Sequence, residues 1–137
     1  MSILQTQTTS FKKELYQAVH NLATDTLKIA LYTGNANLNA DTTAYTSSNE
    51  VVASGYTAGG QALTGVSISS SGYTAYVNWA NVSWTAAITA RCALIYNVTQ
   101  GNKSIAVIDF GADKTSTTTF TITMPANTAT TALIRSS

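Results

Sequence analysis

Hydrophobic and polar positions alternate at every second residue in several segments of the chain after residue 26. In residues 27–33, for example, Leu27, Ile29 and Leu31 fall on one side and the residues between them on the other. This period is typical of β-strands, in which successive side chains point to opposite faces. Turn-forming residues separate about eight such segments, which favours an all-β chain with the architecture of a single β-sandwich or jelly roll. The predicted strands are residues 27–33, 61–69, 73–80, 81–84, 91–97, 104–110, 118–124 and 131–136.

Two of these segments predict the centre of the core. Residues 91–97 are almost continuously apolar, which is typical of a strand that is covered on both faces. Residues 104–110 follow after a short turn and are nearly as apolar. The side chains that we expect to be buried are Leu94, Ile95, Val107, Ile108 and Phe120.

Before the strands, one segment has the period of a helix. Phe11, Leu15, Ala18, Val19 and Leu22 recur on one stripe, which predicts a short α-helix over residues 10–22. Either Thr9 or Ser10 can cap its N-terminus through the side-chain oxygen.

The flanking segments complete the predicted domain organisation. Residues 1–9 are expected to form an N-terminal arm, and residues 10–137 a single domain that includes the helix. Residues 34–51 are polar and rich in turn formers, and we expect an exposed loop there. Both the arm and this loop are expected to be loosely held until they contact a partner.

The composition changes the picture in one respect, because only 9% of the 137 residues are charged. The difference is made up by threonine, serine, asparagine and alanine, and a surface of short neutral side chains suits a protein that packs against copies of itself or a larger assembly. The net charge of +1 includes no basic run, so direct nucleic-acid binding is not expected. The apolar runs are too short to span a membrane, and residues 1–10 do not have the pattern of a signal peptide.

A glycine-rich stretch at residues 54–65, SGYTAGGQALTG, raises the question of phosphate binding. Phosphate-binding loops continue into a helix, and the P-loop also supplies a lysine. Here Gln61 follows Gly60, no lysine is near, and the next segment is a predicted strand. We therefore interpret the stretch as a sharp turn, in which glycines let another part of the backbone approach closely.

Residues that could support catalysis are few and scattered. His20 is the single histidine and Cys92 the single cysteine, and they are far apart in the sequence, so neither a metal cluster nor a catalytic set is expected. His20 can cap the helix or shield the edge of the core, and Cys92 is expected to be a small buried side chain. Arg91 and Asp109 lie on apolar strands and either pair with each other or face solvent or a partner chain. The sequence therefore predicts a non-enzymatic protein without a cofactor or metal.

The aromatic residues leave two interpretations open. Trp79, Trp84, Tyr45 and Tyr56 could form a protein interface, and the two tryptophans could equally fill the core. Alternatively, a row of exposed rings could stack on sugars, which would make the protein a carbohydrate-binding module.

Four stretches together resemble a family of small structural proteins of tailed bacteriophages. They are TTSFKKELYQAVHNLATDTLKIALYTGNANLNADTTAYT (8–46), NEVVASGYTAGGQALTGV (49–66), ARCALIYN (90–97) and AVIDFGADKTSTTTFTITMP (106–125). The resemblance implies a virion protein that is made in the bacterial host cytoplasm, and it transfers no catalytic residue.

The function that we expect on this basis is that of a capsid decoration, or cement, protein on the outer surface of the phage head. Such a protein would bind the major capsid protein and copies of itself, and would stabilise the head by bridging capsid subunits. A tail or fibre component and a sugar-binding module for host attachment are the alternatives.

Overall fold

The computed structural model describes residue 3 and residues 5–136, and it contains one short helix and ten strands within them. The largest sheet has the antiparallel order β1-β8-β7-β2-β3. A second sheet has the order β10-β5-β4, and β6 pairs with β9 alone. The strands are β1 (Thr6–Gln7), β2 (Leu27–Tyr32), β3 (Gln61–Ala62), β4 (Ser67–Ser71), β5 (Thr74–Asn78), β6 (Val82–Trp84), β7 (Thr89–Asn97), β8 (Lys103–Thr115), β9 (Phe120–Ile122) and β10 (Ile134–Ser136).

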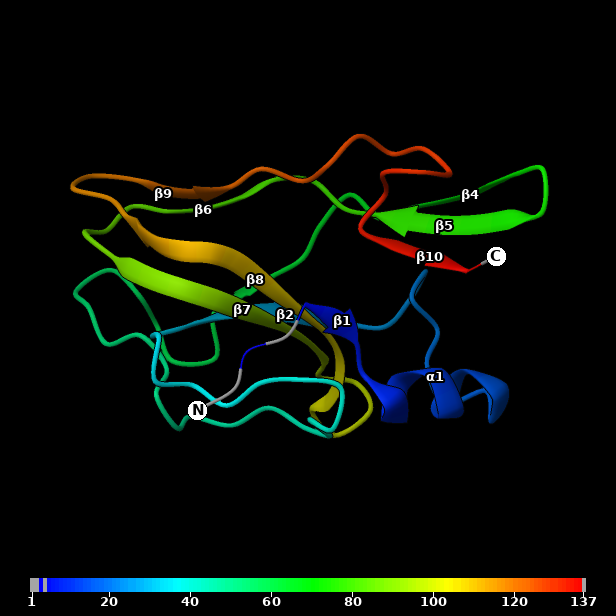
Figure 1. The fold of residues 1–137 in the computed structure, drawn as a ribbon, viewed down its shortest axis with the longest axis horizontal. Coiled ribbons are helices and arrows are strands. Elements are labelled where there is room, and N and C mark those ends of the chain that lie inside the picture. The colour runs from blue at the N-terminus through cyan, green and yellow to red at the C-terminus, as the bar shows by residue number, and fades with distance from the viewer. Residues whose placement is uncertain (1–2, 4, 137) are drawn as a thin grey trace.

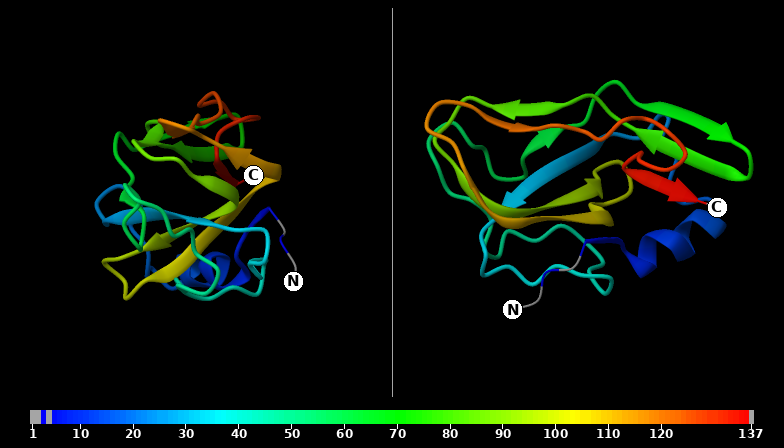
Figure 2. Two further views of the ribbon diagram at one scale, coloured as in Figure 1. Left: turned by 90° about the vertical axis from the view of Figure 1, so that its left-hand side faces the viewer. Right: turned by 45° about the horizontal axis from the view of Figure 1, so that its top comes forward.

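The two smaller sheets lie on one side of the five-stranded sheet, as Figure 1 and the end-on view in Figure 2 show. The all-β class with one short N-terminal helix is therefore as predicted. Because the strands form three separate sheets, the expected sandwich or jelly roll is not confirmed.

The main core fills the space between these layers. Along β2 and β7, alternate side chains such as Ile29, Leu31 and Ile95 point into it, as the two-residue period requires. The facing strands contribute Trp84 and Phe120. Leu94, Ile95, Val107 and Phe120 are buried as predicted, whereas Ile108 is only half-buried at the edge of the core.

The other face of the five-stranded sheet is also apolar, and residues 33–50 cover it (Figure 1). Leu38, 1% exposed, packs there against Leu94 and Val107. Residues 34–51 do lie outside the named helices and strands, as predicted, but the expectation of an exposed, loosely held loop is wrong where the segment packs on the sheet, at Ala36, Leu38, Glu50 and Val51. Ala36 and Leu38 alternate with exposed asparagines, but the apolar run is short and the residues after it are polar, so little in the sequence indicates that the segment covers the second face of β7.

The helix is shorter than predicted and begins earlier. The helix α1 spans Thr9–Tyr16, and its N-cap is Thr8, whose hydroxyl accepts a hydrogen bond from the N–H of Phe11 at 3.3 Å. It ends because Ala18 adopts a left-handed conformation with φ of 57°. The N–H of Val19 then donates back to the carbonyl of Glu14 at 3.0 Å, which closes the helix.

The N-terminal arm is not free in the isolated chain, contrary to the prediction. Thr6 and Gln7 form β1 on the edge of β8, and Thr8 is fully buried. Ile3 bridges to Leu38 of the covering segment. Residues 1, 2 and 4 of the predicted arm, and residue 137 of the predicted domain, lie outside the described residues.

Two further strand boundaries differ from the prediction. Residues 61–69 are interrupted near Gly65, so that β3 and β4 belong to different sheets. Residues 111–115, beyond the end of the predicted strand 104–110, also belong to β8, and the β7–β8 register shifts between Ala90 and Cys92. These polar residues are exposed, so no apolar period marks them as a strand.

Candidate functional site

A buried carboxylate holds the covering segment 33–50 to the rest of the fold. Glu50 is only 7% exposed. Its carboxylate accepts hydrogen bonds from the hydroxyls of Tyr45 and Tyr56, both at 2.5 Å, and from the N–H of Gly59 at 2.7 Å. Burial, together with the hydrogen bond to the Glu50 carboxylate, raises the pKa of Tyr45 and Tyr56 above the usual range. Both hydroxyls therefore remain protonated donors at neutral pH.

Two more tyrosines tie this network to the sheet. The hydroxyl of Tyr96 on β7 donates to the carbonyl of Gly59 at 2.6 Å, and its ring stacks on Tyr45 with the centroids 4.7 Å apart. Tyr32 on β2 donates to the carbonyl of Thr46 at 2.7 Å. Since these polar groups bond to one another, the cluster acts as a clamp on two loops. Sequence reasoning missed it, because the partners have no recognisable spacing in the sequence.

The glycine-rich stretch serves the same clamp. A Cβ on Gly60 would lie 1.8 Å from the carbonyl oxygen of Ile29, and one on Gly55 would lie 2.5 Å from that of Thr85. Both glycines have positive φ, 80° and 92° respectively. The interpretation of a sharp turn with close backbone approach is therefore confirmed.

His20 belongs to a second polar network, which joins the end of α1 to the end of β7. The amide of Asn97 donates to His20 Nδ1 at 2.9 Å, so the ring proton is assigned to Nε2, which lies 2.9 Å from Glu14 Oε1. The same amide reaches Asp25 Oδ2 at 2.8 Å. Hydrogen bonds from the backbone N–H of Asn21 and from Asn97 lower the pKa of Asp25. Both ring nitrogens of His20 thus have protein partners, and the network shields a core edge as the sequence analysis allowed.

The predicted ion pair between Arg91 and Asp109 is present. The guanidinium Nη2 lies 3.3 Å from Asp109 Oδ1, on neighbouring strands of the largest sheet. Both side chains are about a quarter exposed, at 28% and 23%, so the pair contributes at most about 1 kcal/mol of stability. Asp109 Oδ1 also accepts from the N–H of Gly111 at 2.8 Å, which supports the irregular part of β8.

Cys92 is fully buried beside this pair. Burial raises the pKa of its thiol to about 12. The thiolate, which is the reactive form, is therefore scarce at neutral pH, and Cys92 behaves as a core side chain.

The aromatic residues proposed for an interface lie mainly inside the protein. Trp79, Trp84 and Tyr56 are 6%, 2% and 8% exposed, and Tyr45 is half-buried against Tyr96. An interface or sugar site built on the two tryptophans is therefore ruled out for the folded chain. The alternating pattern around Trp79 and Trp84 does not show whether these rings face the core or the solvent. In this fold both side chains point into the core.

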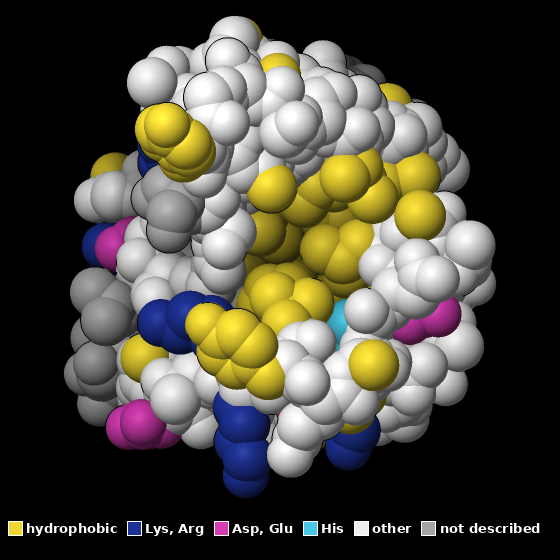
Figure 3. Space-filling view, turned by 90° about the vertical axis from the view of Figure 1, so that its right-hand side faces the viewer, with side chains coloured by type: hydrophobic (Ala, Val, Ile, Leu, Met, Phe, Trp, Pro, Cys, Tyr) yellow, Lys and Arg dark blue, Asp and Glu magenta, His cyan; other side chains and the backbone are white. Residues whose placement is uncertain are grey.

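The largest exposed apolar feature at the helix end of the molecule is a groove between α1 and the β10-β5-β4 sheet. It has a volume of about 410 Å³, and Figure 3 shows it as a hollow of hydrophobic side chains with His20 at its rim. Leu15 on α1 and Ile68 on β4 are 42% and 53% exposed. The residues that line this groove, called the α1–β4 groove below, include Phe11, Leu15, Leu22, Ile68, Val77 and Ile134.

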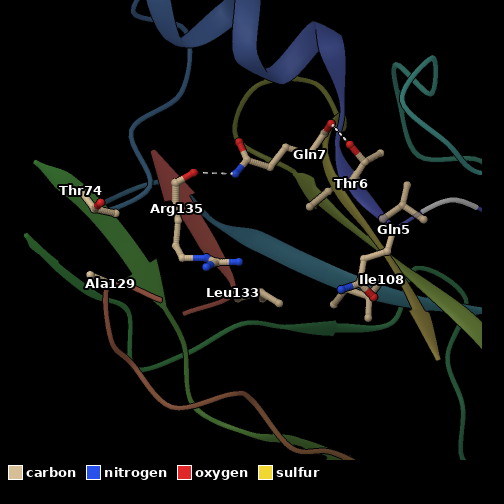
Figure 4. Close-up of a pocket in the computed structure, with 10 residues that line it drawn as sticks. Gln5, Thr6, Gln7, Thr74, Ile108, Ala129, Leu133 and Arg135 are labelled. Atoms are coloured by element: carbon tan, nitrogen blue, oxygen red, sulfur yellow. Dashed lines mark hydrogen bonds between the residues drawn. The ribbon is translucent and has the colours of Figure 1, made fainter. Parts of the chain in front are cut away.

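Two other hollows lie beside β8. One, of about 380 Å³, separates the edge strands β1 and β10, and there the side-chain amide of Gln7 donates to the carbonyl of Arg135 at 3.0 Å (Figure 4). Gln5 accepts from the N–H of Asp109 at 3.1 Å at its margin. The other, of about 670 Å³, lies between β8 and β9 over Phe110 and Met124. The first hollow is lined mainly by neutral polar groups, and two of them, Gln5 and Gln7, bond to the backbone. Such a lining suits a contact between the two sheets better than it suits a catalytic site.

These features define a small, mostly β protein with internally bonded polar clusters and an apolar groove at its helix end. Within residue 3 and residues 5–136, no group of three His, Cys, Asp or Glu side chains is placed to hold a metal ion. In the same part of the chain, no helix has the length and apolar character needed to cross a membrane. No protein-family model, curated protein or solved structure matches the chain.

Proposed function

We propose that the protein is a non-enzymatic structural component of a bacteriophage particle, namely a decoration protein on the outer surface of the capsid. The observation that carries the proposal is the α1–β4 groove, an apolar hollow at the helix end of a protein with few charged residues. An exposed apolar patch of this kind marks a contact site for another protein. The sequence features that resemble phage structural proteins indicate the setting in which such a contact is needed.

The polar residues of the protein support a structural role. The Glu50 and His20 networks bond to groups within the chain and hold loops and the helix in place. A general base would need a free lone pair directed at a substrate. His20 directs both nitrogens at protein groups, so the groove beside it is suited to packing against a partner.

The proposed partner is the major capsid protein. Covering Leu15 and Ile68 completely would contribute roughly 1 kcal/mol each, since a fully exposed leucine or isoleucine gains about 1.5–3 kcal/mol on burial and these are already about half covered. Contacts of this size act through their number. A protein that bridges capsid subunits in many copies can oppose the pressure of packaged DNA through modest contacts.

The test is to reconstitute particles that lack the protein with purified variants. Leu15→Asp places a charge in the groove, on an exposed helix position, and should reduce occupancy on the capsid at least about tenfold. Val52→Asp is the matched control, because Val52 is 97% exposed and does not line the groove. Depleted particles should also lose DNA at lower temperature than complete ones.

Two results would contradict the proposal. Equal occupancy of the Leu15→Asp and Val52→Asp variants would show that the groove does not bind the capsid. A protein present in only a few copies per particle, whose loss abolishes adsorption to cells but not heat resistance, would belong to the tail or fibre.

A further inference from the structure

The strand β4 is the open edge of the three-stranded sheet, and its pairing with β5 fixes which backbone groups are free. Ser71 lies opposite Thr74 and closes a two-residue turn, so this pair exchanges hydrogen bonds within the hairpin. Hydrogen-bonded pairs alternate along an antiparallel ladder, and Ser69 is therefore also bonded to β5. The backbone N–H and C=O groups of Ile68 and Ser70 consequently point away from the sheet, toward the open edge.

This edge lacks the features that usually prevent strand pairing. All five residues, Ser67–Ser71, are exposed, and none of them is charged or a proline. Natural sheets commonly protect an open edge with a lysine, a proline or a covering segment. Asn127 touches the strand by donating to the hydroxyl of Ser67 at 2.9 Å, but Ser67 points to the face opposite Ile68 and leaves the open backbone groups uncovered.

An apolar row crosses the sheet and ends at the same edge. Ile134 on β10 lies opposite Val77 on β5, which lies opposite Ile68 on β4. Their exposed fractions are 6%, 5% and 53%, so the row is covered at its inner end and open at its outer end. In stable sheets, side chains directly opposite each other on neighbouring strands pack together. The row thus lacks one neighbour, on the side of Ile68.

We propose that a second copy of this chain supplies that neighbour, through antiparallel pairing of the two β4 strands around a twofold axis at Ile68. Each Ile68 then exchanges backbone hydrogen bonds with Ile68 of the second copy, and each Ser70 with Val66. The apolar row becomes continuous through both subunits. The pairing is isologous, since the same neutral edge serves both partners, and it forms a six-stranded sheet.

The pair has a consequence for the groove. A twofold axis perpendicular to the sheet keeps both α1–β4 grooves on the same face, so the dimer presents two apolar contact sites to one surface. That use of the dimer rests on the proposed function, whereas the pairing itself is a property of the isolated chain.

Sedimentation velocity of the purified full-length chain over a concentration series tests the association. The wild type should form dimers. Ser70→Pro removes an outward N–H without touching the bonds to β5, and Ile68→Lys charges the edge; each should weaken dimerisation at least about tenfold. Ser70→Thr and Ile68→Val, which keep the N–H and the apolar row, are the matched controls and should dimerise as the wild type does. Circular dichroism of each variant establishes that the fold is retained.

Disulfide trapping tests the register. In the proposed pairing the two Ile68 Cα atoms are about 5.5 Å apart, within the range that a disulfide spans. The two Ser70 residues are offset by four positions, roughly 13 Å along the strands. Ile68→Cys should therefore form a covalent dimer on mild oxidation and Ser70→Cys should not, with the buried Cys92 unreactive in both.

The inference is overturned if the wild type stays monomeric at high concentration, if folded Ser70→Pro and Ile68→Lys variants still dimerise, or if Ser70→Cys is trapped in preference to Ile68→Cys. These outcomes are separate from those of the capsid test. A dimer with the predicted trapping that does not bind capsids would retain the pairing and refute the proposed function. Capsid binding by a strict monomer would do the reverse.

Discussion

Replacing Glu50 by alanine should loosen the segment that covers the second face of the largest sheet. The substitution removes the acceptor of the buried Tyr56 hydroxyl and of the Gly59 N–H. Each unpaired buried donor costs about 1–3 kcal/mol, while Tyr45 is half-buried and can bond to water instead. Part of the loss is offset because a carboxylate no longer has to be buried. We expect the free energy of unfolding to fall by about 2–4 kcal/mol, a large share of the 5–15 kcal/mol typical of a small domain.

Glu50→Gln is the matched control for this experiment. A glutamine can keep its carbonyl oxygen toward Tyr56 and Gly59 and present its amide to Tyr45, whose hydroxyl can reverse and accept. We expect a loss of no more than about 1 kcal/mol. Urea unfolding measures the free energies, and hydrogen exchange should show faster exchange of backbone amides in residues 33–50 of Glu50→Ala alone. The clamp is refuted if Glu50→Ala is within about 0.5 kcal/mol of the wild type and these amides stay protected.

Three further changes test other parts of the fold. Gly60→Ala should prevent folding or destabilise the protein by several kcal/mol, because the new Cβ would meet the Ile29 carbonyl. Gly72 faces open space, so Gly72→Ala should cost only about 1 kcal/mol, for its positive φ. Thermal unfolding compares the two variants, and similar losses would contradict the close approach at Gly60. Leu94→Ala should reduce the free energy of unfolding by about 2–5 kcal/mol, measured in urea, since Leu94 is fully buried, and a loss below about 1 kcal/mol would contradict its place in the core. Burial raises the pKa of three buried tyrosines, and that of Tyr96 reaches about 12. Unfolded tyrosines ionise near pH 10, so the unfolded state loses its protons first: stability should hold below about pH 10 and fall above it, by about 1.4 kcal/mol per pH unit for each tyrosine. A flat stability curve up to about pH 11.5 would contradict the burial of these hydroxyls. The three buried tyrosines whose hydroxyls would ionise late in the folded protein are Tyr32, Tyr56 and Tyr96.

Strands such as β2 and β7 could be predicted from the sequence because each carries its own pattern of apolar residues, whereas β1 and the last part of β8 carry none. In β7 the continuous apolar run correctly indicated that both faces are covered, but not what covers them. The end of α1 could not be predicted, since Ala18 favours helix and is left-handed here only because the chain turns back to place His20 between Glu14 and Asn97. Such a turn depends on contacts between residues far apart in the sequence.

The candidate sites divide in the same way. The pairing of Arg91 and Asp109 was one of the arrangements that two charges on apolar strands allowed, and the structure shows that it is the one formed. The Glu50 clamp had no such signal, because the tyrosines that bond around it, Tyr45, Tyr56 and Tyr96, come from three separate segments of the chain. The α1–β4 groove had no signal either. Its sides come from α1 near the N-terminus, from the β4–β5 hairpin and from β10 near the C-terminus, and no local pattern shows that these segments meet.

The covering segment 33–50 and the α1–β4 groove both bear on how much apolar surface the protein exposes. A chain with 9% charged residues has little to keep it apart from its neighbours if apolar faces are exposed. Leu38 and Glu50 keep the outer face of the largest sheet, with Leu94 at its centre, closed in the isolated chain. Closing that face leaves the apolar surface at Leu15 and Ile68 as a separate patch at the helix end, and a bounded patch favours specific docking. Opening the clamp would expose the outer face of the largest sheet as a second apolar surface, so Glu50→Ala should promote non-specific association. Because this association does not use the β4 edge, adding Ser70→Pro to the Glu50→Ala variant should not suppress it.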